Sequence, residues 1–324
     1  MPDKDELARE AAATGFRPEA LDKTIRLFEL LEALRSHPFL RSRVALKGGT
    51  ALNLFVLDAP RLSVDIDFDY IGAAQRAAML AERPRMEQAL QMVCERLRVR
   101  IKHVPGEHAG GKWRVSYTTL TGRPGTIELD VNFLIRTPLW QVAPTDSKRI
   151  GSFEATRIPM LDLHELAAGK LAALFGRAAI RDIFDVRELL AARTLDAGKL
   201  RLAFVVYGGI NRRDWRTVTL DDVRADPVQV DRQLVPLLRG SASPAREDLA
   251  AWTERLVSEC RDRLQVVLPL RPEEIEFLDR LNDRGEIVGE LLTGDPAMQR
   301  LIGAHPGLQW KARNVREHRG LAAD

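Results

Sequence analysis

Two segments of the chain alternate polar and apolar residues, which is the pattern of a β-strand with one buried face. They are residues 63–70 and 127–133. The apolar members predicted to face a core are Val64, Ile66, Phe68, Tyr70, Ile127, Leu129, Val131 and Phe133. The polar members predicted to share the opposite faces are Ser63, Asp65, Asp67, Asp69, Glu128, Asp130 and Asn132. Carboxylates crowded on one face repel each other unless water or a cation screens them.

The rest of the first half mixes helical and strand patterns. Apolar residues at helical spacing from Leu21 to Leu31 predict a helix that ends before Pro38. Short apolar or alternating runs predict strands at residues 44–46, 99–104 and 113–117. Further helices are predicted at residues 51–55 and 73–97.

From about Ile158 the strand signals give way to helical ones. Helices are predicted at residues 163–175, 181–192, 245–264 and 272–292, whereas residues 208–240 fit neither period. We therefore predict an α/β fold in two domains. Residues 1–158 would form an α/β domain with a mixed sheet flanked by helices, and residues 159–324 would form a mainly helical domain.

The composition is that of an ordinary globular protein, with 45% hydrophobic and 29% charged residues. Its 324 residues exceed the usual size of one domain, which agrees with two separate cores. The isoelectric point near 9.0 favours partners that carry phosphate. A basic surface that serves only solubility is the alternative.

The cysteines and the first residues bear on location. Cys94 and Cys260 are far apart and lack metal-ligand spacing, so neither a disulfide framework nor a zinc site is expected. The first residues carry neither a basic start nor an apolar run, and no stretch approaches the roughly eighteen apolar residues of a membrane span. We therefore expect a cytoplasmic protein with no membrane partner.

A Gly48-Gly49-Thr50 turn connects the predicted strand 44–46 to a helix. Glycine has no Cβ, so backbone N–H groups at such a turn are accessible to the phosphates of a nucleotide. A Gly-Gly pair alone is more often ordinary turn chemistry. Here, however, Asp65 follows sixteen residues after Gly49, with Asp67 two residues further on.

Asp130, on the second alternating segment, supplies a third carboxylate. If the two strands lie side by side, Asp65, Asp67 and Asp130 predict a site for one or two Mg²⁺ ions. Such a site would hold a nucleoside triphosphate (NTP) for in-line displacement of pyrophosphate. The alternative for the acids is a strand face in water.

Lys170 is the only charged residue between Glu165 and Arg177 in an alanine-rich helix, so its ammonium group is expected to be partly buried. A buried ammonium needs an anion. Arg177 lies seven residues on and shares nearly the same helix face, so both side chains could reach one phosphate. Asp185 on the next helix would pair with Lys170, orient it or accept a proton, and an ordinary salt bridge between helices is the alternative.

Over about residues 40 to 190 the chain resembles the AbiEii-type nucleotidyltransferase toxins, which are abortive-infection (phage-defence) toxins of type IV toxin–antitoxin systems. The segments that carry the resemblance are residues 46–52, 63–68, 129–131, 164–170 and 181–185. The first of these motifs is shared by the wider DNA polymerase β-like nucleotidyltransferases. The block with Lys170 and Asp185 narrows the resemblance to the toxins.

The resemblance implies an enzyme that uses Mg²⁺ to transfer a nucleotide from an NTP onto RNA. In characterised relatives the acceptor can be the 3′ end of tRNA, a tRNA modification that blocks aminoacylation and so halts translation. The implied catalytic residues are Asp65, Asp67, Lys170 and Asp185, the nucleotide-binding residues are Gly48, Gly49, Thr50, Ser63, Lys170 and Arg177, and the metal ligands are Asp65, Asp67 and Asp130. A separately encoded antitoxin is the implied partner, and Ser63 is a candidate for phosphorylation by it.

Two other functions stay open at this point. A nucleotidyltransferase that acts on a small molecule, such as an aminoglycoside, would need the same metal site without a basic groove. A non-catalytic RNA-binding protein would keep the fold and lose turnover. Basic residues at 212–216 and 311–319 favour RNA, although such runs usually serve only to face water.

Overall fold

The structure is a computed structural model that describes residues 2–104, 110–193 and 195–320. It contains two compact units that interleave along the chain. Unit 1 comprises Met1–Arg136, Gln141–Asp162 and Val228–Leu249, and unit 2 comprises Thr137–Trp140, Leu163–Pro227 and Ala250–Asp324. The sequence predicts a single division after residue 158, whereas the structure returns residues 228–249 to the first unit.

Unit 1 is built on a mixed sheet with the strand order β3-β4-β5-β2-β1-β7-β6. The strands are β1 (Val44–Lys47), β2 (Ile66–Tyr70), β3 (Arg100–Val104), β4 (Gly111–Thr118), β5 (Pro124–Asn132), β6 (Ala143–Thr145) and β7 (Ile158–Met160). β2 pairs with β5 in parallel and with β1 in antiparallel orientation. The predicted mixed sheet is confirmed, and the two alternating acidic segments lie on neighbouring strands.

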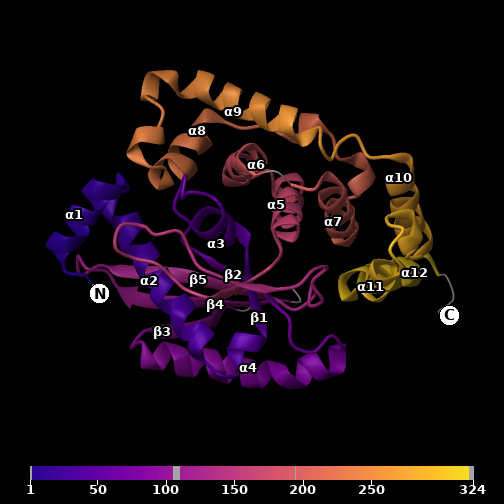
Figure 1. Cartoon of the computed structure of the whole chain (residues 1–324), viewed down its shortest axis with the longest axis horizontal. Coiled ribbons are helices and arrows are strands. Elements are labelled where there is room, and N and C mark those ends of the chain that lie inside the picture. The colour runs from indigo at the N-terminus through magenta and orange to yellow at the C-terminus, as the bar shows by residue number, and fades with distance from the viewer. Residues whose placement is uncertain (1, 105–109, 194, 321–324) are drawn as a thin grey trace. The chain divides into compact units, whose positions relative to one another are not determined.

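One face of this sheet is apolar and covered by helices. Trp113, Val115, Ile127 and Leu129 are buried there. Helix α2 (Pro18–Ser36) contacts β5 and β7, and helix α4 (Arg76–Arg96) contacts β3. Figure 1 shows α4 along one side of the sheet and the short helix α3 (Gly48–Ala51) on the other. The alternation in the sequence thus corresponds to one face under helices and one polar face.

Segment 228–249 joins unit 1 through backbone hydrogen bonds. Leu62 N donates to Leu237 O at 2.9 Å, and Gly240 N donates to Gly15 O at 2.7 Å. Gly15 ends helix α1 (Lys4–Thr14) with a positive φ of 75°. The segment begins inside the one-turn helix α8 (Pro227–Gln229) and continues through several short helical turns. Its partners lie far away in sequence, which explains why it shows no local periodicity.

Unit 2 is helical. Its helices are α5 (Leu163–Arg177), α6 (Ile180–Ala192), α7 (Ala197–Ile210), α9 (Leu249–Leu264), α10 (Pro272–Asp279), α11 (Pro296–Ala304) and α12 (Pro306–Arg319). The rings of Phe175, Phe204 and Trp215 form a cluster with centroids 5.1 to 6.0 Å apart. A Cβ on Gly208 would collide with the Trp215 ring, so this glycine lets the indole pack against α7.

Several elements differ from the predictions, and β6 and the helices α1, α11 and α12 have no predicted counterpart. Helix α7 was not predicted because it is buried on nearly every side and so has no polar stripe. β7 lies where the strand signals were expected to stop, and its three residues are too few to show a period. The predicted helix 272–292 ends early, since α10 continues only as a π-helical turn to Arg284 and Gly285 then turns the chain with a φ of 66°.

The predicted α/β architecture, a mixed sheet with flanking helices followed by helical structure, is confirmed. Within the described ranges, no helix combines the length and apolar character needed to cross a bilayer.

Candidate functional site

The first candidate site begins at the glycine turn between β1 and α3. Gly48 has a φ of 73°, in the left-handed region that favours glycine. A Cβ on Gly48 would also collide with the carboxylate of Asp67 on the neighbouring strand β2. The glycine therefore permits both the turn and the close approach of an acid to it.

Asp67 and Asp130 are register partners on the parallel strands β2 and β5, so their side chains project from the same face. The predicted side-by-side placement of the two acidic strands is confirmed. Asp65 lies just before β2, which begins at Ile66 and not at Ser63 as predicted. Asp69 was predicted to line the polar face of the sheet with Asp67, but it is buried. Lys47 Nζ donates a hydrogen bond to Asp69 Oδ1 at 2.5 Å.

Two lysines reach these acids from neighbouring elements. Lys23 Nζ on α2 lies 3.7 Å from Asp65 Oδ1. Lys112 Nζ on β4 lies 2.6 Å from Glu128 Oε2 and 3.7 Å from Asp130 Oδ2. These lysines contact the same carboxylates that a bound cation would use.

The electrostatics of Asp130 show that negative charge is concentrated here. Burial raises the pKa of Asp130, Lys112 opposes that effect, and the negative charges of Asp67, Glu128 and Asp65 raise it again. The pKa of Asp130 is therefore raised overall, despite the nearby positive charge of Lys112. A cation that entered this site would therefore relieve repulsion among the acids.

Asp65, Asp67 and Asp130 are the candidate metal ligands of this site. Among the residues that the structure describes, no group of three or more His, Cys, Asp or Glu side chains is already placed to hold one. The donor chemistry of Asp65, Asp67 and Asp130 nevertheless fits a hard divalent cation, because all three offer carboxylate oxygens. These are the residues that would hold it.

Thr50 and Ser63 form a buried pair beside the turn. The Thr50 hydroxyl lies 3.0 Å from Ser63 Oγ, to which it can donate, and it also contacts the backbone oxygen of Asp65. Ser63 is only 7% exposed, so a modification of its hydroxyl would require this local packing to open. The pair ties the start of α3 to the segment that carries the acids.

Replacing Gly48 with alanine is expected to lower the free energy of unfolding by about 2–4 kcal/mol. About 1–2 kcal/mol of this arises from the left-handed backbone, and the rest from the collision with Asp67. Gly122→Ala is the matched control, because Gly122 has a φ of 82° and open space around its would-be Cβ. Chemical denaturation would measure both variants. Equal losses would show that the contact with Asp67 adds nothing.

The second candidate site lies in unit 2, where Lys170 on α5 meets two carboxylates of α6. Its Nζ lies 2.9 Å from Asp182 Oδ1 and 3.0 Å from Asp185 Oδ2. All three side chains are buried, at 6%, 1% and 0% exposure. The predicted burial of Lys170 and its pairing with Asp185 are both observed.

Arg177 joins this group through Asp182. Its Nε donates to Asp182 Oδ2 at 2.8 Å and its Nη2 donates to Oδ1 at 3.1 Å, while 66% of the side chain stays exposed. Burial favours a higher pKa for Asp182, but Lys170 and Arg177 outweigh burial and hold the pKa below its ordinary value. Asp182 is thus an ionised link between a buried ammonium and an exposed guanidinium.

Sequence reasoning missed Asp182 as a site residue. It precedes Asp185 by three residues, so the two lie on one helix face. That spacing was the available signal, but the resemblance pointed to Asp185 alone. The structure places Asp182 in contact with both Lys170 and Arg177.

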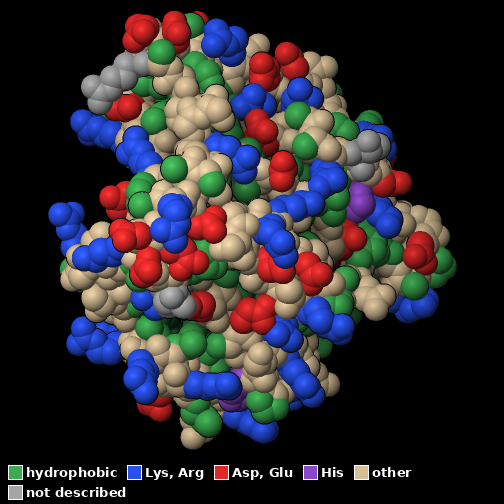
Figure 2. Space-filling model, turned by 60° about the vertical axis from the view of Figure 1, so that its left-hand side comes forward, with side chains coloured by type: hydrophobic (Ala, Val, Ile, Leu, Met, Phe, Trp, Pro, Cys, Tyr) green, Lys and Arg blue, Asp and Glu red, His purple; other side chains and the backbone are tan. Residues whose placement is uncertain are grey.

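Several basic side chains of residues 212–216 and 311–319, which favoured RNA, form ion pairs or hydrogen bonds inside unit 2. The guanidinium of Arg216 contacts carboxylate oxygens of Asp214, Asp279 and Asp283 at 2.6–2.7 Å. Lys311 Nζ donates to a backbone oxygen at 3.0 Å, and burial lowers its pKa. The face shown in Figure 2 likewise carries Lys and Arg interspersed with Asp and Glu. These two runs therefore give little support for an RNA groove.

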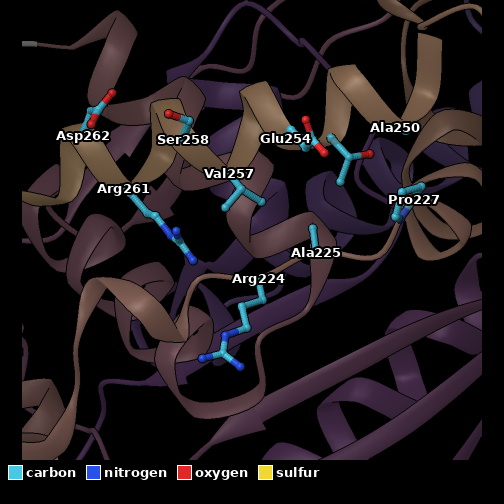
Figure 3. A pocket seen from close by; sticks show the side chains of 10 residues that line it. Arg224, Ala225, Pro227, Ala250, Glu254, Val257, Ser258, Arg261 and Asp262 are labelled. Carbon is cyan, nitrogen blue, oxygen red and sulfur yellow. The ribbon is translucent and has the colours of Figure 1, made fainter.

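A cavity of about 470 Å³ in unit 2 lies between α9 and the segment before α8 (Figure 3). Arg224 and Arg261 line the cavity (Figure 3), but Arg224 Nε donates to Asp221 O and Arg261 donates to Val223 O. Glu254 and Asp262 also line it. This mixed lining contains none of the residues predicted to bind a nucleotide.

The chain resembles known proteins in sequence and in fold. Residues 29–280 match the family described as "Nucleotidyl transferase AbiEii toxin, Type IV TA system". The sequence matches no curated protein. Among solved structures, MenT4, a nucleotidyltransferase toxin from Mycobacterium tuberculosis H37Rv, is similar with a TM-score of 0.55 at 19% identity, and the match covers 95% of this chain and 99% of that one.

Proposed function

The chain belongs to the AbiEii family of nucleotidyltransferase toxins of type IV toxin–antitoxin systems, and on this premise we propose that it transfers a nucleoside monophosphate to the 3′ end of tRNA. Membership makes it an NTP-using nucleotidyltransferase toxin and implies an antitoxin partner. The family generally uses a divalent metal, and we propose Mg²⁺. The acceptor, the choice of metal, a role in phage defence and a cytoplasmic location are the parts that need testing.

The placement of Asp67 carries this proposal. It contacts the glycine turn at Gly48 and shares a sheet face with Asp130. A glycine turn that is suited to phosphate and a pair of carboxylates are thus adjacent within unit 1. This combination is what phosphoryl transfer requires, because catalysis there consists largely of positioning and charge neutralisation.

Within this proposal each residue has a defined task. Gly48, Gly49 and Thr50 supply the backbone N–H groups for the phosphates of the NTP. Ser63, held by Thr50, supplies a hydroxyl beside them. Asp65, Asp67 and Asp130 hold the cation, which when bound neutralises phosphate charge and makes the acceptor hydroxyl easier to deprotonate.

The cluster around Lys170 is proposed to serve the same reaction. Lys170 and Asp185 are too deeply buried to reach a substrate without rearrangement, so their contacts support a positioning role. Through Asp182 they hold Arg177, whose largely exposed guanidinium is suited to a phosphate of the nucleotide. Arg177 thus remains a proposed nucleotide-binding residue of unit 2, whereas Lys170, predicted to bind the nucleotide directly, is proposed to act through Asp182 and Arg177.

The test is a labelling assay with each of the four NTPs, Mg²⁺ and total RNA. We expect one nucleotide to label a tRNA-sized band, and EDTA to abolish the label. Label on a small hydroxylated compound but not on RNA would favour the aminoglycoside-type reaction. RNA binding with no label from any nucleotide would favour a binding protein and overturn the proposal.

A further inference from the structure

The polar face of the sheet continues beyond the acids onto β4 and β3. Cross-strand partners share a face, and β4 pairs with β5 through Lys112↔Asp130 and Arg114↔Glu128. β3 pairs with β4 through Lys102↔Arg114 and Arg100↔Ser116. Arg100, Lys102, Lys112 and Arg114 therefore lie on the same face as Asp67 and Asp130. We call these four residues the basic face.

Charge changes sign across this face. β2 and β5 present Asp67, Glu128 and Asp130, whereas β4 and β3 present only basic charged residues. Arg100 and Lys102 are exposed. Arg114 is 53% exposed, although its Nη2 lies 3.6 Å from Glu128 Oε1. Adjacent strands lie about 4.8 Å apart, so β4 and β3 lie about 10 and about 14 Å from β2.

We infer that the basic face binds the sugar-phosphate backbone of the RNA acceptor, a few nucleotides from the end that receives the nucleotide. This inference rests on the proposed function. The acids mark the reacting end, and like-charged phosphates would be repelled there unless positive groups held the strand further along. The glycine turn accounts for the phosphates of the NTP, so the basic face is left for the acceptor.

The side chains of this face also indicate which parts of RNA it would contact. The aromatic residues of β4, Trp113 and Tyr117, alternate with the basic ones and so point to the opposite face. Binding would therefore rest on phosphate contacts without base stacking. It should depend strongly on salt and little on sequence.

The test compares two triple variants of the whole chain. Arg100→Ala/Lys102→Ala/Arg114→Ala removes three of the four charges of the basic face and spares Lys112, which pairs with Glu128 and Asp130. The matched control, Lys4→Ala/Arg41→Ala/Arg96→Ala, removes three exposed basic side chains that lie outside this sheet face. Fluorescence anisotropy in EDTA would measure binding of labelled bulk tRNA and of oligouridine, and thermal unfolding would verify that both variants fold.

We expect the face variant to bind both RNAs about tenfold more weakly, with a salt slope smaller by about 2, since each phosphate contact contributes about 0.7 on a single strand. In transfer assays, KM for RNA should rise while KM for the NTP changes less than twofold. The control should bind as wild type does.

Three outcomes would separate this inference from the proposed function. Unchanged RNA binding in the face variant, with wild-type transfer intact, would overturn the inference alone. A raised KM for the NTP without weaker RNA binding would assign the face to the triphosphate and also overturn it. Weaker RNA binding by the face variant, with no transfer by wild type, would support the surface and overturn the proposed function.

Discussion

Asp67→Asn is expected to lower the rate of nucleotidyl transfer by about a thousandfold, equivalent to about 4 kcal/mol of transition-state stabilisation. Asparagine keeps the shape of aspartate but removes the charge that would hold a cation. Asp67 combines contact with Gly48 and pairing with Asp130, so no neighbouring acid can take its place. Single-turnover assays at saturating NTP and RNA would measure the loss.

The same substitution should not destabilise the fold. The negative charge of Asp67 contributes to the raised pKa of both Asp69 and Asp130, which means that it repels them. Removing that charge relieves the repulsion, so the melting temperature should stay equal or rise. Lost activity together with retained stability is the trade-off expected of a residue kept for function.

Asp58→Asn is the control, since Asp58 is an exposed acid nearby in sequence. It should transfer nucleotide at the wild-type rate. If Asp67→Asn kept more than about a tenth of wild-type activity, the negative charge of Asp67 would not be essential for transfer. The proposal that Asp65, Asp67 and Asp130 together hold a cation would then be wrong.

Much of unit 1 was predictable because its sheet buries one face. Alternation located β2 and β5 and indicated that Asp67 and Asp130 would project away from the core. Alternation cannot distinguish buried from exposed at the end of a strand, and so it misplaced Asp69. That acid lies in the same face pattern as Asp67, but Lys47 pairs with it inside the protein.

The long-range features were beyond sequence reasoning for a common physical reason. Residues 228–249 join unit 1 through hydrogen bonds to Leu62 and Gly15, and no local pattern encodes such partners. The arginine run at 212–216 looked like a surface for RNA. Arg216 instead meets three carboxylates, two of them more than sixty residues away in sequence.

Lys170→Met is expected to destabilise the protein by about 3–5 kcal/mol and to reduce transfer by each folded molecule at least about a hundredfold. The stability loss follows because Asp182 and Asp185 would remain buried with one cation fewer. The activity loss follows if this cluster positions Arg177 for the nucleotide. Denaturation would give the first quantity, and transfer rates corrected for the folded fraction would give the second.

A second buried ion pair separates these two effects. Arg201 and Glu274 are also buried in unit 2, with Nη2 and Oε2 2.5 Å apart, and no proposed step involves them. Arg201→Met should therefore cost similar stability, because it leaves Glu274 without its guanidinium, while each folded molecule transfers nucleotide at the wild-type rate. If both variants lost stability and neither lost activity per folded molecule, the Lys170 cluster would be structural only. Retained stability in Lys170→Met would instead mean that Asp182 and Asp185 do not depend on the ammonium for their burial.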